Sequence, residues 1–317
     1  MNSLNINRCA SSKGSINRHM INGVAAYDYF SPKQIINELK SNTRLYFNND
    51  LNILKQANDI LKLKTSDSKV VEEIIYKFGL RLAEILYIFE NPSIEQMNHR
   101  KDYSKEDWDY LKSIKRIYIA GGLLTKEFSL IFEKALEDYF SKNCFNKEVI
   151  FITESSNLAL EGLTKVITNN SLVYDFGQTN VKNGVYRNKE LIIKDPITVS
   201  ISKQEDLKLY ASNCNNFILD VLLNQLKSNP DITEINMAIS NYVNNGVIDP
   251  APWYYGVLYY FRPDYEEFLR EKLSEILKKE IKVKLYHDTT AMGYSIKEKE
   301  NAMLISLGTA FGVCYFD

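Results

Sequence analysis

The amino-acid sequence predicts an α/β fold built from two domains. The chain has 317 residues, of which 45% are hydrophobic and 25% are charged, so it can bury two apolar cores. Short apolar runs typical of buried strands alternate with amphipathic stretches typical of helices, and several of the apolar runs end in a Gly-rich or acidic turn. Strands that alternate with helices favour a mixed sheet covered by helices.

The N-terminal half is expected to be mainly helical. Ser31 followed by Pro32 is typical of a helix start, with serine as the cap and proline in the first turn. Apolar residues recur at every third or fourth position over residues 66–89, which predicts a long amphipathic helix. After it, we expect a polar stretch over residues 95–109, a strand over 117–120 and a helix over 128–140.

From residue 172 onward the pattern changes to strands interrupted by two long helices. The expected elements, in order, are strands 172–174, 184–186, 191–194 and 197–202, a helix 204–229, a strand 234–240, a loop 241–246, a helix 264–279, and strands 281–286, 302–307 and 313–316. This order suits an α/β domain with a mixed sheet.

The segment Tyr174–Lys182 follows an apolar strand and reads Tyr-Asp-Phe-Gly-Gln-Thr-Asn-Val-Lys. Such a turn suits a nucleotide phosphate with a metal ion, because Gly177 lets the backbone approach the phosphate and Asp175 supplies a carboxylate for Mg²⁺. Gln178 and Thr179 offer further hydrogen-bond donors. A strand-turn-strand hairpin with a structural glycine explains the same residues equally simply.

Three further turns follow apolar strands. They are Gly121–Leu124 after strand 117–120, His287–Gly293 after strand 281–286, and Gly308–Gly312 after strand 302–307. Each motif is weak alone, and chance matches in an ordinary α/β protein are the alternative. Jointly they are much stronger evidence for a phosphate-binding protein.

Together these segments resemble the actin-like ATPase superfamily of sugar kinases, and within it the glucokinase and ROK (repressor, ORF, kinase) branch. Asp175–Thr179 is similar to the first phosphate motif, and Gly308–Gly312 is similar to the second. His287–Thr289 is similar to the motif with the catalytic base, and Gly121–Gly122 is similar to the adenosine motif. Ser155–Gly162 resembles a connecting helix with glycine at a close helix crossing. The resemblance implies two ribonuclease H-like domains with mixed five-stranded sheets. Residues 1–164 with 297–317 would form the adenosine-binding domain, and residues 165–296 the domain of the first phosphate motif and the catalytic Asp.

The resemblance implies ATP and Mg²⁺ as cofactors. Asp288 would be the general base, although an Asp that caps a helix starting at Thr289 is the alternative. Asp175 would hold Mg²⁺ through water. The implied phosphate contacts are Thr179, Gly308 and Thr309, and the implied adenosine contacts are Gly121 and Gly122. Lys182 has two interpretations, a phosphate contact or a solvated strand lysine, and we leave it out of the catalytic set.

The order of the motifs differs from that in the family, where the first phosphate motif opens the chain and the adenosine motif comes near its end. Here the adenosine motif comes first and the second phosphate motif comes last, which indicates a circular permutation. The permutation predicts that Leu4–Asn7 forms a strand beside Tyr315 and Phe316.

Several departures from the family concern the substrate. His287 replaces the usual Asn, and a sugar-hydroxyl contact and simple packing are both open interpretations. The family's Gly-Glu-x-Gly-His segment is missing; Asn22–Ala25 resembles the family's next helix start, which places Arg18 about where an acid is usual. Asp249 and Trp253 lie in a loop where such kinases often contact substrate, with a capped core edge as the alternative. Ala310 replaces a glycine and would be strained if its φ were positive.

The composition gives no indication of several classes of partner and metal site. A net charge of −1 gives no reason to expect nucleic acid or a membrane surface as partner, and the N-terminus lacks a signal-peptide run, so we expect a cytoplasmic protein. Cys9, Cys144, Cys214 and Cys314 are too widely spaced to indicate a zinc site.

These residues favour an ATP- and Mg²⁺-dependent kinase that phosphorylates a hydroxyl of a sugar or sugar-like small molecule and closes its domains over it. Two alternatives stay open: a non-catalytic nucleotide- or sugar-binding sensor or scaffold of the same fold, and an ATP-dependent carbamoyl or acyl transferase. A homodimer is also open.

Overall fold

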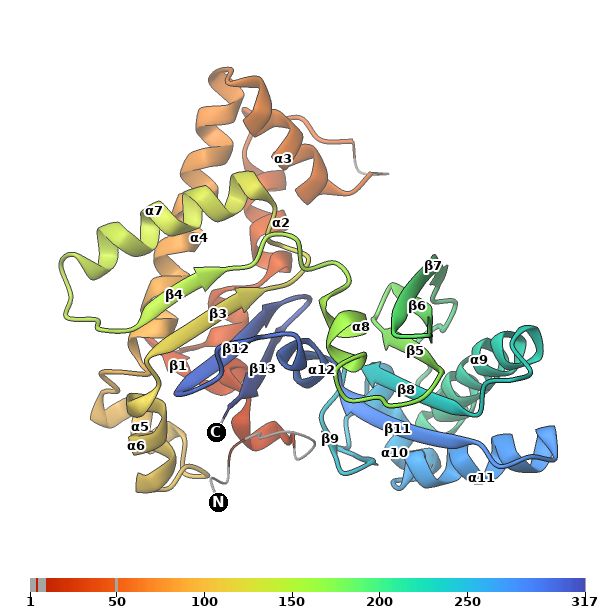
Figure 1. Cartoon of the computed structure of the whole chain (residues 1–317). Helices are drawn as coiled ribbons and strands as arrows, with labels where there is room; N and C mark the ends of the chain where they lie inside the picture. Colours follow the sequence, from red (N-terminus) through yellow and green to blue (C-terminus); the bar gives the residue numbers. More distant parts are fainter. Residues whose placement is uncertain (1–3, 5–9, 49–50, 317) are drawn as a thin grey trace. The chain divides into compact units, whose positions relative to one another are not determined.

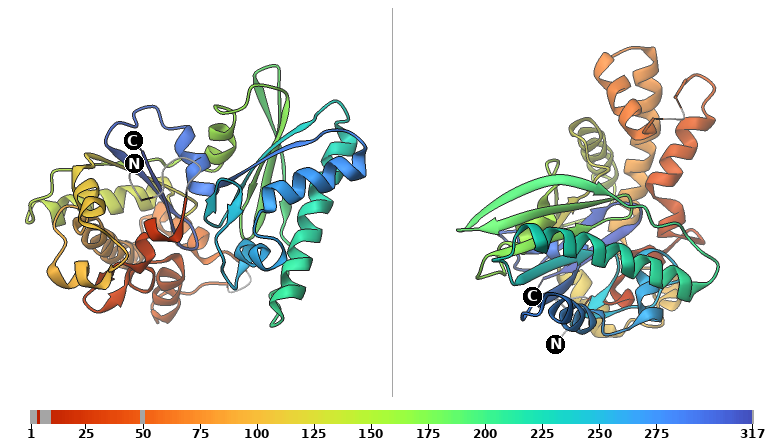
Figure 2. Two further views of the ribbon diagram at one scale, coloured as in Figure 1. Left: turned by 90° about the horizontal axis from the view of Figure 1, so that it is seen from below. Right: turned by 90° about the vertical axis from the view of Figure 1, so that its right-hand side faces the viewer.

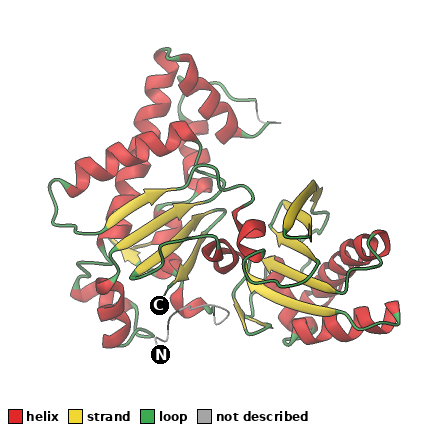
Figure 3. Ribbon diagram, in the orientation of Figure 1, coloured by secondary structure: helices red, strands yellow, loops and turns green. Residues whose placement is uncertain are grey.

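The computed structural model describes residues 4, 10–48 and 51–316 and divides the chain into two compact units (Figure 1). Unit 1 comprises residues 1–3, 15–156 and 300–317, and unit 2 comprises residues 4–14 and 157–299. Both units combine helices with a mixed sheet, so the chain is an α/β protein (Figure 3). The unit boundaries differ from the expected ones at 164 and 296 chiefly because helix α8 (Leu158–Leu163) packs on helix α12 (Asp288–Tyr294) of unit 2.

Unit 2 contains a five-stranded sheet with the order β11-β8-β5-β6-β7. Its strands are β11 (Lys282–His287), β8 (Glu234–Ile239), β5 (Ser171–Phe176), β6 (Asn180–Arg187) and β7 (Glu190–Thr198). The first three are parallel, and β5, β6 and β7 form an antiparallel meander. The three parallel strands therefore end at one edge of the sheet, where α/β proteins usually hold their ligands.

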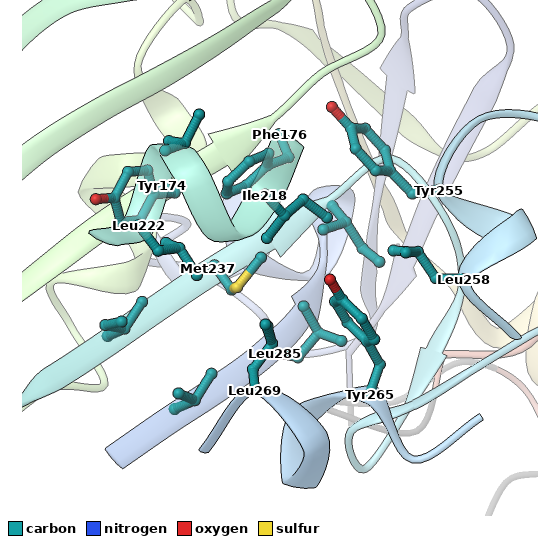
Figure 4. Packing of buried hydrophobic residues seen from close by; sticks show 14 of the residues in the cluster. Tyr174, Phe176, Ile218, Leu222, Met237, Tyr255, Leu258, Tyr265, Leu269 and Leu285 are labelled. Carbon is teal, nitrogen blue, oxygen red and sulfur yellow. The ribbon is translucent and has the colours of Figure 1, made fainter. Parts of the chain in front are cut away.

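Helices cover both faces of this sheet. On one face, every second residue of the parallel strands, such as Tyr174, Phe176 and Met237, is buried against α9 (Leu207–Ser228) and α11 (Tyr265–Leu277) (Figure 4). The short helices α8 and α12 contact the same strands but contribute no residue to that cluster. The alternation along each strand assigns Asp175 to the face opposite Phe176.

Unit 1 contains a four-stranded mixed sheet with the order β13-β12-β3-β4. Its strands are β13 (Phe311–Tyr315), β12 (Ala302–Leu307), β3 (Arg116–Ala120) and β4 (Glu148–Phe151), and β13 alone is antiparallel to its neighbour. The long helices α4 (Ser66–Tyr87) and α7 (Lys126–Phe140) pack together on it. We expected five strands, and the described part of unit 1 has four in this sheet. Leu4, the first residue of the predicted strand Leu4–Asn7, is in a bend and belongs to unit 2 rather than to the unit of Tyr315 and Phe316, which counts against that strand; residues 5–7 lie outside the described residues.

The remaining elements are short. They are η1 (Ser12–Gly14), η2 (Ile16–Arg18), β1 (Met20–Ile21), β2 (Val24–Ala25), α1 (Ala26–Tyr29), α2 (Pro32–Ser41), α3 (Ile53–Leu63), α5 (Ile94–His99), α6 (Lys105–Ser113), β9 (Val243–Asn244), β10 (Val247–Ile248), η3 (Tyr254–Val257) and α10 (Leu258–Phe261). None of the helices in the described ranges has the length and apolar character needed to cross a bilayer.

The predicted long elements are present, but three local predictions are wrong. Strands 191–194 and 197–202 are one strand, β7, which continues through Pro196 because an edge strand can lack one N–H donor. The polar stretch 95–109 contains α5 and α6, each opened by a capping box at Ser93 or Ser104. The loop 241–246 contains β9 and a turn at Asn245, which leads to β10.

The ring of one buried histidine in unit 1 has no hydrogen-bond partner among the residues that the structure describes. His19 has no exposed surface and is surrounded by the rings of Phe89, Tyr103 and Trp108, with centroids 5.6–5.9 Å from its own. Neither ring nitrogen has a partner within the described part of the chain. Burial, assisted by the charge of Arg100, lowers the pKa of His19 to about 3.

The substitution His19→Phe is therefore expected to stabilise unit 1. An aromatic ring without polar atoms removes two unsatisfied nitrogens, which should add about 1–3 kcal/mol at pH 7.5. Because the folded pKa is depressed below 6.5, wild-type stability is complete above that pH and falls as the pH drops, by about 2 kcal/mol at pH 5. Urea unfolding at both pH values checks this, with the exposed His99→Phe as control. Equal pH dependence in wild type and His19→Phe would contradict the assignment.

Candidate functional site

Polar residues gather where the three parallel strands of unit 2 end. Phe176, Ile239 and His287 lie in one row across β5, β8 and β11. Asp175 stands one position before this row and Asp288 one position after it. The register of the sheet thus brings together two carboxylates that are 113 positions apart in the sequence.

Asp175 forms an ion pair with Lys182 on the neighbouring strand β6. Its Oδ2 lies 3.3 Å from the Lys182 Nζ, and its side chain is 13% exposed. Burial raises the pKa of Asp175, the Lys182 charge lowers it, and the Asp288 charge raises it again. Asp175 and Lys182 are direct partners in the sheet register, so the β5–β6 pairing itself creates the contact.

Asp288 occupies the first turn of helix α12. Its Oδ1 accepts hydrogen bonds from the Thr289 backbone N–H at 2.6 Å and the Thr289 hydroxyl at 3.1 Å. Burial raises the pKa of Asp288 to about 6, although these bonds and the Lys182 charge oppose the shift. The helix starts at Asp288 with His287 as its N-cap, so the alternative of an Asp that caps a helix starting at Thr289 is wrong. The raised pKa is that of a general base that works near neutral pH.

His287 orients Asp288. The His287 ring is 4% exposed; its Nε2 lies 3.2 Å from Asp288 Oδ1 and its Nδ1 lies 3.3 Å from the Thr290 hydroxyl. Burial lowers the pKa of His287 to about 3, so the ring is neutral and satisfies both contacts when Nε2 carries the proton. Tyr242 stacks on it with ring centroids 4.8 Å apart. These contacts match the packing interpretation of His287, and its sugar contact stays a prediction.

The turn after β5 is closed by its own hydrogen bonds. The Gly177 N–H donates to the carbonyl oxygens of Asp175 and Asn180, both at 3.1 Å, and a Cβ at Gly177 would lie 3.0 Å from the Asn180 oxygen. The Tyr255 hydroxyl donates to the Gly177 carbonyl at 3.0 Å. The tight contact that a Cβ would make with the Asn180 oxygen favours glycine in the turn. Thr179 is exposed at its tip.

Two buried polar atoms at this edge have no partner in the residues that the structure describes. They are the Gln178 Oε1 after β5 and the Ser240 Oγ after β8. Buried polar atoms are normally hydrogen-bonded, so unsatisfied atoms on two segments that follow the parallel strands are typical of a place where a polar ligand or water binds. Ser240 was not predicted from the sequence.

The loop after β8 contributes Asp249. Its Oδ2 accepts a hydrogen bond from the Ser12 N–H at 2.8 Å, and its charge raises the pKa of His287 against the effect of burial. The Asn241 side chain donates to the Asp249 carbonyl at 2.9 Å. Trp253, the other predicted substrate contact in this loop, is 57% exposed.

The remaining predicted site residues belong to unit 1. Gly121 has φ +118°, and a Cβ there would lie 2.6 Å from the Leu307 carbonyl oxygen, so close packing of β3 on β12 demands glycine. A Cβ at Gly122 would meet no atom within 4 Å. Gly308 and Thr309 lie in the turn between β12 and β13.

Two sequence departures in unit 1 have local explanations. Ala310 is absent from the residues with positive φ, so the turn tolerates alanine without backbone strain. Arg18 ends η2 and forms a 3.2 Å ion pair with Asp102, with its side chain 56% exposed. Asn22 and Gly23 form the turn between β1 and β2, and helix α1 begins directly after β2.

A magnesium ion fits the acidic residues of unit 2 only through water. The described residues include no group of three or more His, Cys, Asp or Glu side chains placed to bind a metal. Mg²⁺ commonly keeps several waters and takes one or two carboxylates together with substrate phosphates. Asp175 and Asp288 provide that number of carboxylates.

Sequence reasoning missed the supporting residues of this site. Lys182 had been set aside, yet it interacts with both carboxylates. The spacing Asp175 to Lys182 across a three-residue hairpin loop was the available signal, because it predicts that the two side chains are cross-strand partners. Ser240 and Tyr255 gave no sequence signal, since their positions depend on long-range packing. No protein-family model matches this chain, and no significant relative is found among curated proteins.

Proposed function

We propose that this protein is an ATP- and Mg²⁺-dependent phosphotransferase that phosphorylates a hydroxyl group of a sugar or sugar-like small molecule. The observation that carries the proposal is the pair of half-buried carboxylates, Asp175 and Asp288, at the ends of parallel strands, with the Lys182 charge acting on both. Phosphoryl transfer needs little more from a protein than positioning, electrostatic compensation and one base. The choice of ATP as the nucleotide rests on the resemblance of the sequence motifs to those of actin-like sugar kinases.

In this proposal Asp288 is the base. It takes the proton of the acceptor hydroxyl while the hydroxyl oxygen forms its bond to the γ-phosphorus and the bond to the ADP oxygen breaks. His287 and Thr289 hold the carboxylate in one orientation. Asp175 would hold Mg²⁺ through water, and the ion would neutralise phosphate charge.

The proposed fold is a circularly permuted actin-like ATPase. Besides the order of the motifs, one contact within unit 1 supports this proposal. The Asn17 side chain exchanges two hydrogen bonds with the backbone of Phe311, at 2.7 Å and 3.0 Å, although the two residues are 294 positions apart. The segment at Asn17 thus lies beside the start of β13, which brings segments from opposite ends of the sequence together within unit 1.

An ADP-release assay with a panel of sugars, amino sugars and sugar acids tests the proposed function, together with calorimetric titration of ATP and Mg²⁺. We expect acceptor-dependent ADP release in wild type and in the control Asp231→Asn, which changes an exposed carboxylate that pairs with Arg187. ATP binding without turnover on any acceptor would instead support the sensor alternative. One observation favours that alternative, since the Gly177 N–H is engaged within its own turn. Absence of ATP binding would refute both.

A further inference from the structure

Strand β7 forms an open edge of the unit 2 sheet. The strand order ends at β7, and no further strand pairs with its outer side among the residues that the structure describes. Seven of its nine residues are exposed, including Ile192 at 50% and Ile193 at 46%. Figure 2 shows β6 and β7, in green, as a long hairpin. The hairpin turns at Asn188 and Lys189, which both have positive φ as a two-residue type I′ turn requires.

An apolar edge of this kind is a template for pairing with another strand, and natural proteins usually protect such edges with charges, proline or a covering element. Pro196 and the flanking lysines protect the ends of β7. Residues Leu191–Ile193, in the first half of the strand, have no such protection. They present three consecutive aliphatic side chains on an unpaired edge.

The charges of β7 are arranged with opposite signs about Ile192. Glu190 and Lys194 lie two positions before and after it. Within the described residues, neither of these two side chains has an intramolecular ion pair. Arg187, the cross-strand neighbour of Glu190, is bonded to Asp231 instead.

This arrangement is self-complementary for one register only. If two copies of β7 pair antiparallel about Ile192, each Glu190 faces the Lys194 of the other copy. An axis at Ile193 or Leu191 would place charged residues opposite aliphatic ones, and parallel pairing in register would place like charges together. Opposite charges directly across a strand pair stabilise it, and like charges destabilise it.

The paired strands would form aliphatic contacts on both faces of the joined sheet. Ile192 of each copy meets the other on one face, and Leu191 meets Ile193 on the opposite face, because side chains alternate along a strand. The Ile192 pair is flanked on its own face by Glu190 and Lys194, which have opposite charges. Such a contact is isologous, the type that closes a twofold dimer.

We propose that two copies of this chain associate by antiparallel pairing of β7 about Ile192, which joins the two five-stranded sheets into one. The occupant of the edge is therefore a second copy of the chain. This inference is independent of the catalytic proposal.

Sedimentation equilibrium of the full chain tests the proposal. Wild type is expected to be a dimer, and Lys194→Glu should weaken the dimer at least about tenfold, because Glu190 then faces a like charge. The double variant Glu190→Lys with Lys194→Glu should restore it. The control Lys282→Glu reverses an exposed charge on β11, at the other edge of the same sheet, and should have no effect.

A cross-link tests the register. In a Cys9→Ser and Cys144→Ser background, Ile192→Cys is expected to form a disulfide-linked dimer on oxidation, whereas Leu209→Cys, exposed on α9, should not. A wild type that stays monomeric at about 100 µM would overturn the proposal, since a stable closed dimer should have a lower dissociation constant. A dimer that is insensitive to Lys194→Glu would overturn it too, because another surface would then hold the copies together.

Discussion

Gly162→Ala is expected to destabilise unit 2 by more than about 3 kcal/mol, beyond the usual cost of an overpacked core. Helices α8 and α12 approach so closely at this residue that a Cβ would lie 1.8 Å from the Ala291 carbonyl oxygen and 3.2 Å from the Ser295 backbone nitrogen. Backbone atoms cannot rotate away as side chains do, so the helices must separate. This separation would also displace Asp288 and Thr289 at the start of α12.

In an ordinary helix, replacing glycine by alanine stabilises by about 1 kcal/mol. Gly162→Ala should do the opposite, because of the close contact between α8 and α12. Urea unfolding followed by circular dichroism, combined with hydrogen exchange resolved over residues 157–299, measures the effect on unit 2. Glu161→Ala, on the exposed side of the same helix, is the control and should change stability little. An unchanged or increased stability of Gly162→Ala would show that α8 does not lie against α12 as described.

Asp288→Asn is expected to lower kcat by a factor of about 10²–10⁴ on whichever acceptor the assay identifies, because an amide cannot take the hydroxyl proton. In wild type the rate should rise with pH through about 6, where the Asp288 carboxyl loses its proton. The matched control is Asp231→Asn. Turnover of Asp288→Asn within tenfold of wild type would remove Asp288 as the base.

The same substitution is expected to increase stability at neutral pH. Burial raises the pKa of Asp288 from 3.8 to about 6, so the folded protein holds a proton that the unfolded chain has already lost. The stabilisation by the neutral carboxyl is complete below about pH 4 and is lost as the pH rises through 6. Asparagine stays neutral, and Asp288→Asn should be more stable than wild type by about 2 kcal/mol at pH 8 and by little at pH 4. Equal stability of the two proteins at pH 8 would contradict the burial of an ionised Asp288.

The long elements of the fold could be predicted from the sequence because they have strong periodicity. The helix predicted over 66–89 is α4, which ends two residues earlier, and the strand at 302–307 has the predicted limits. Ser31 caps α2 as expected, accepting a hydrogen bond from the Gln34 N–H. The misses were short elements whose signals are local and subtle, such as the capping boxes that open α5 and α6.

The candidate site could be predicted only in part. Asp175 and Asp288 were identified because each stands at the end of an apolar strand. Their mutual electrostatic influence and the Lys182 contact depend on the register of β5 with β6 and β8, which joins positions far apart in the sequence. The stacking of His287 on Tyr242 likewise depends on how the folded chain packs, which the sequence does not show.

The sequence by itself determined the α/β class, the positions of the long helices and strands, and the acidic and Gly-rich turns, because these follow from the spacing of apolar residues and from the backbone freedom of glycine. The tertiary structure decided the strand register, the division into units and the close contact at Gly162. It also decided the raised pKa of Asp288, since loss of water around a carboxylate depends on what packs over it. The charges of β7 combine both kinds of information: their symmetry is visible in the sequence, and their place on an open edge comes from the fold.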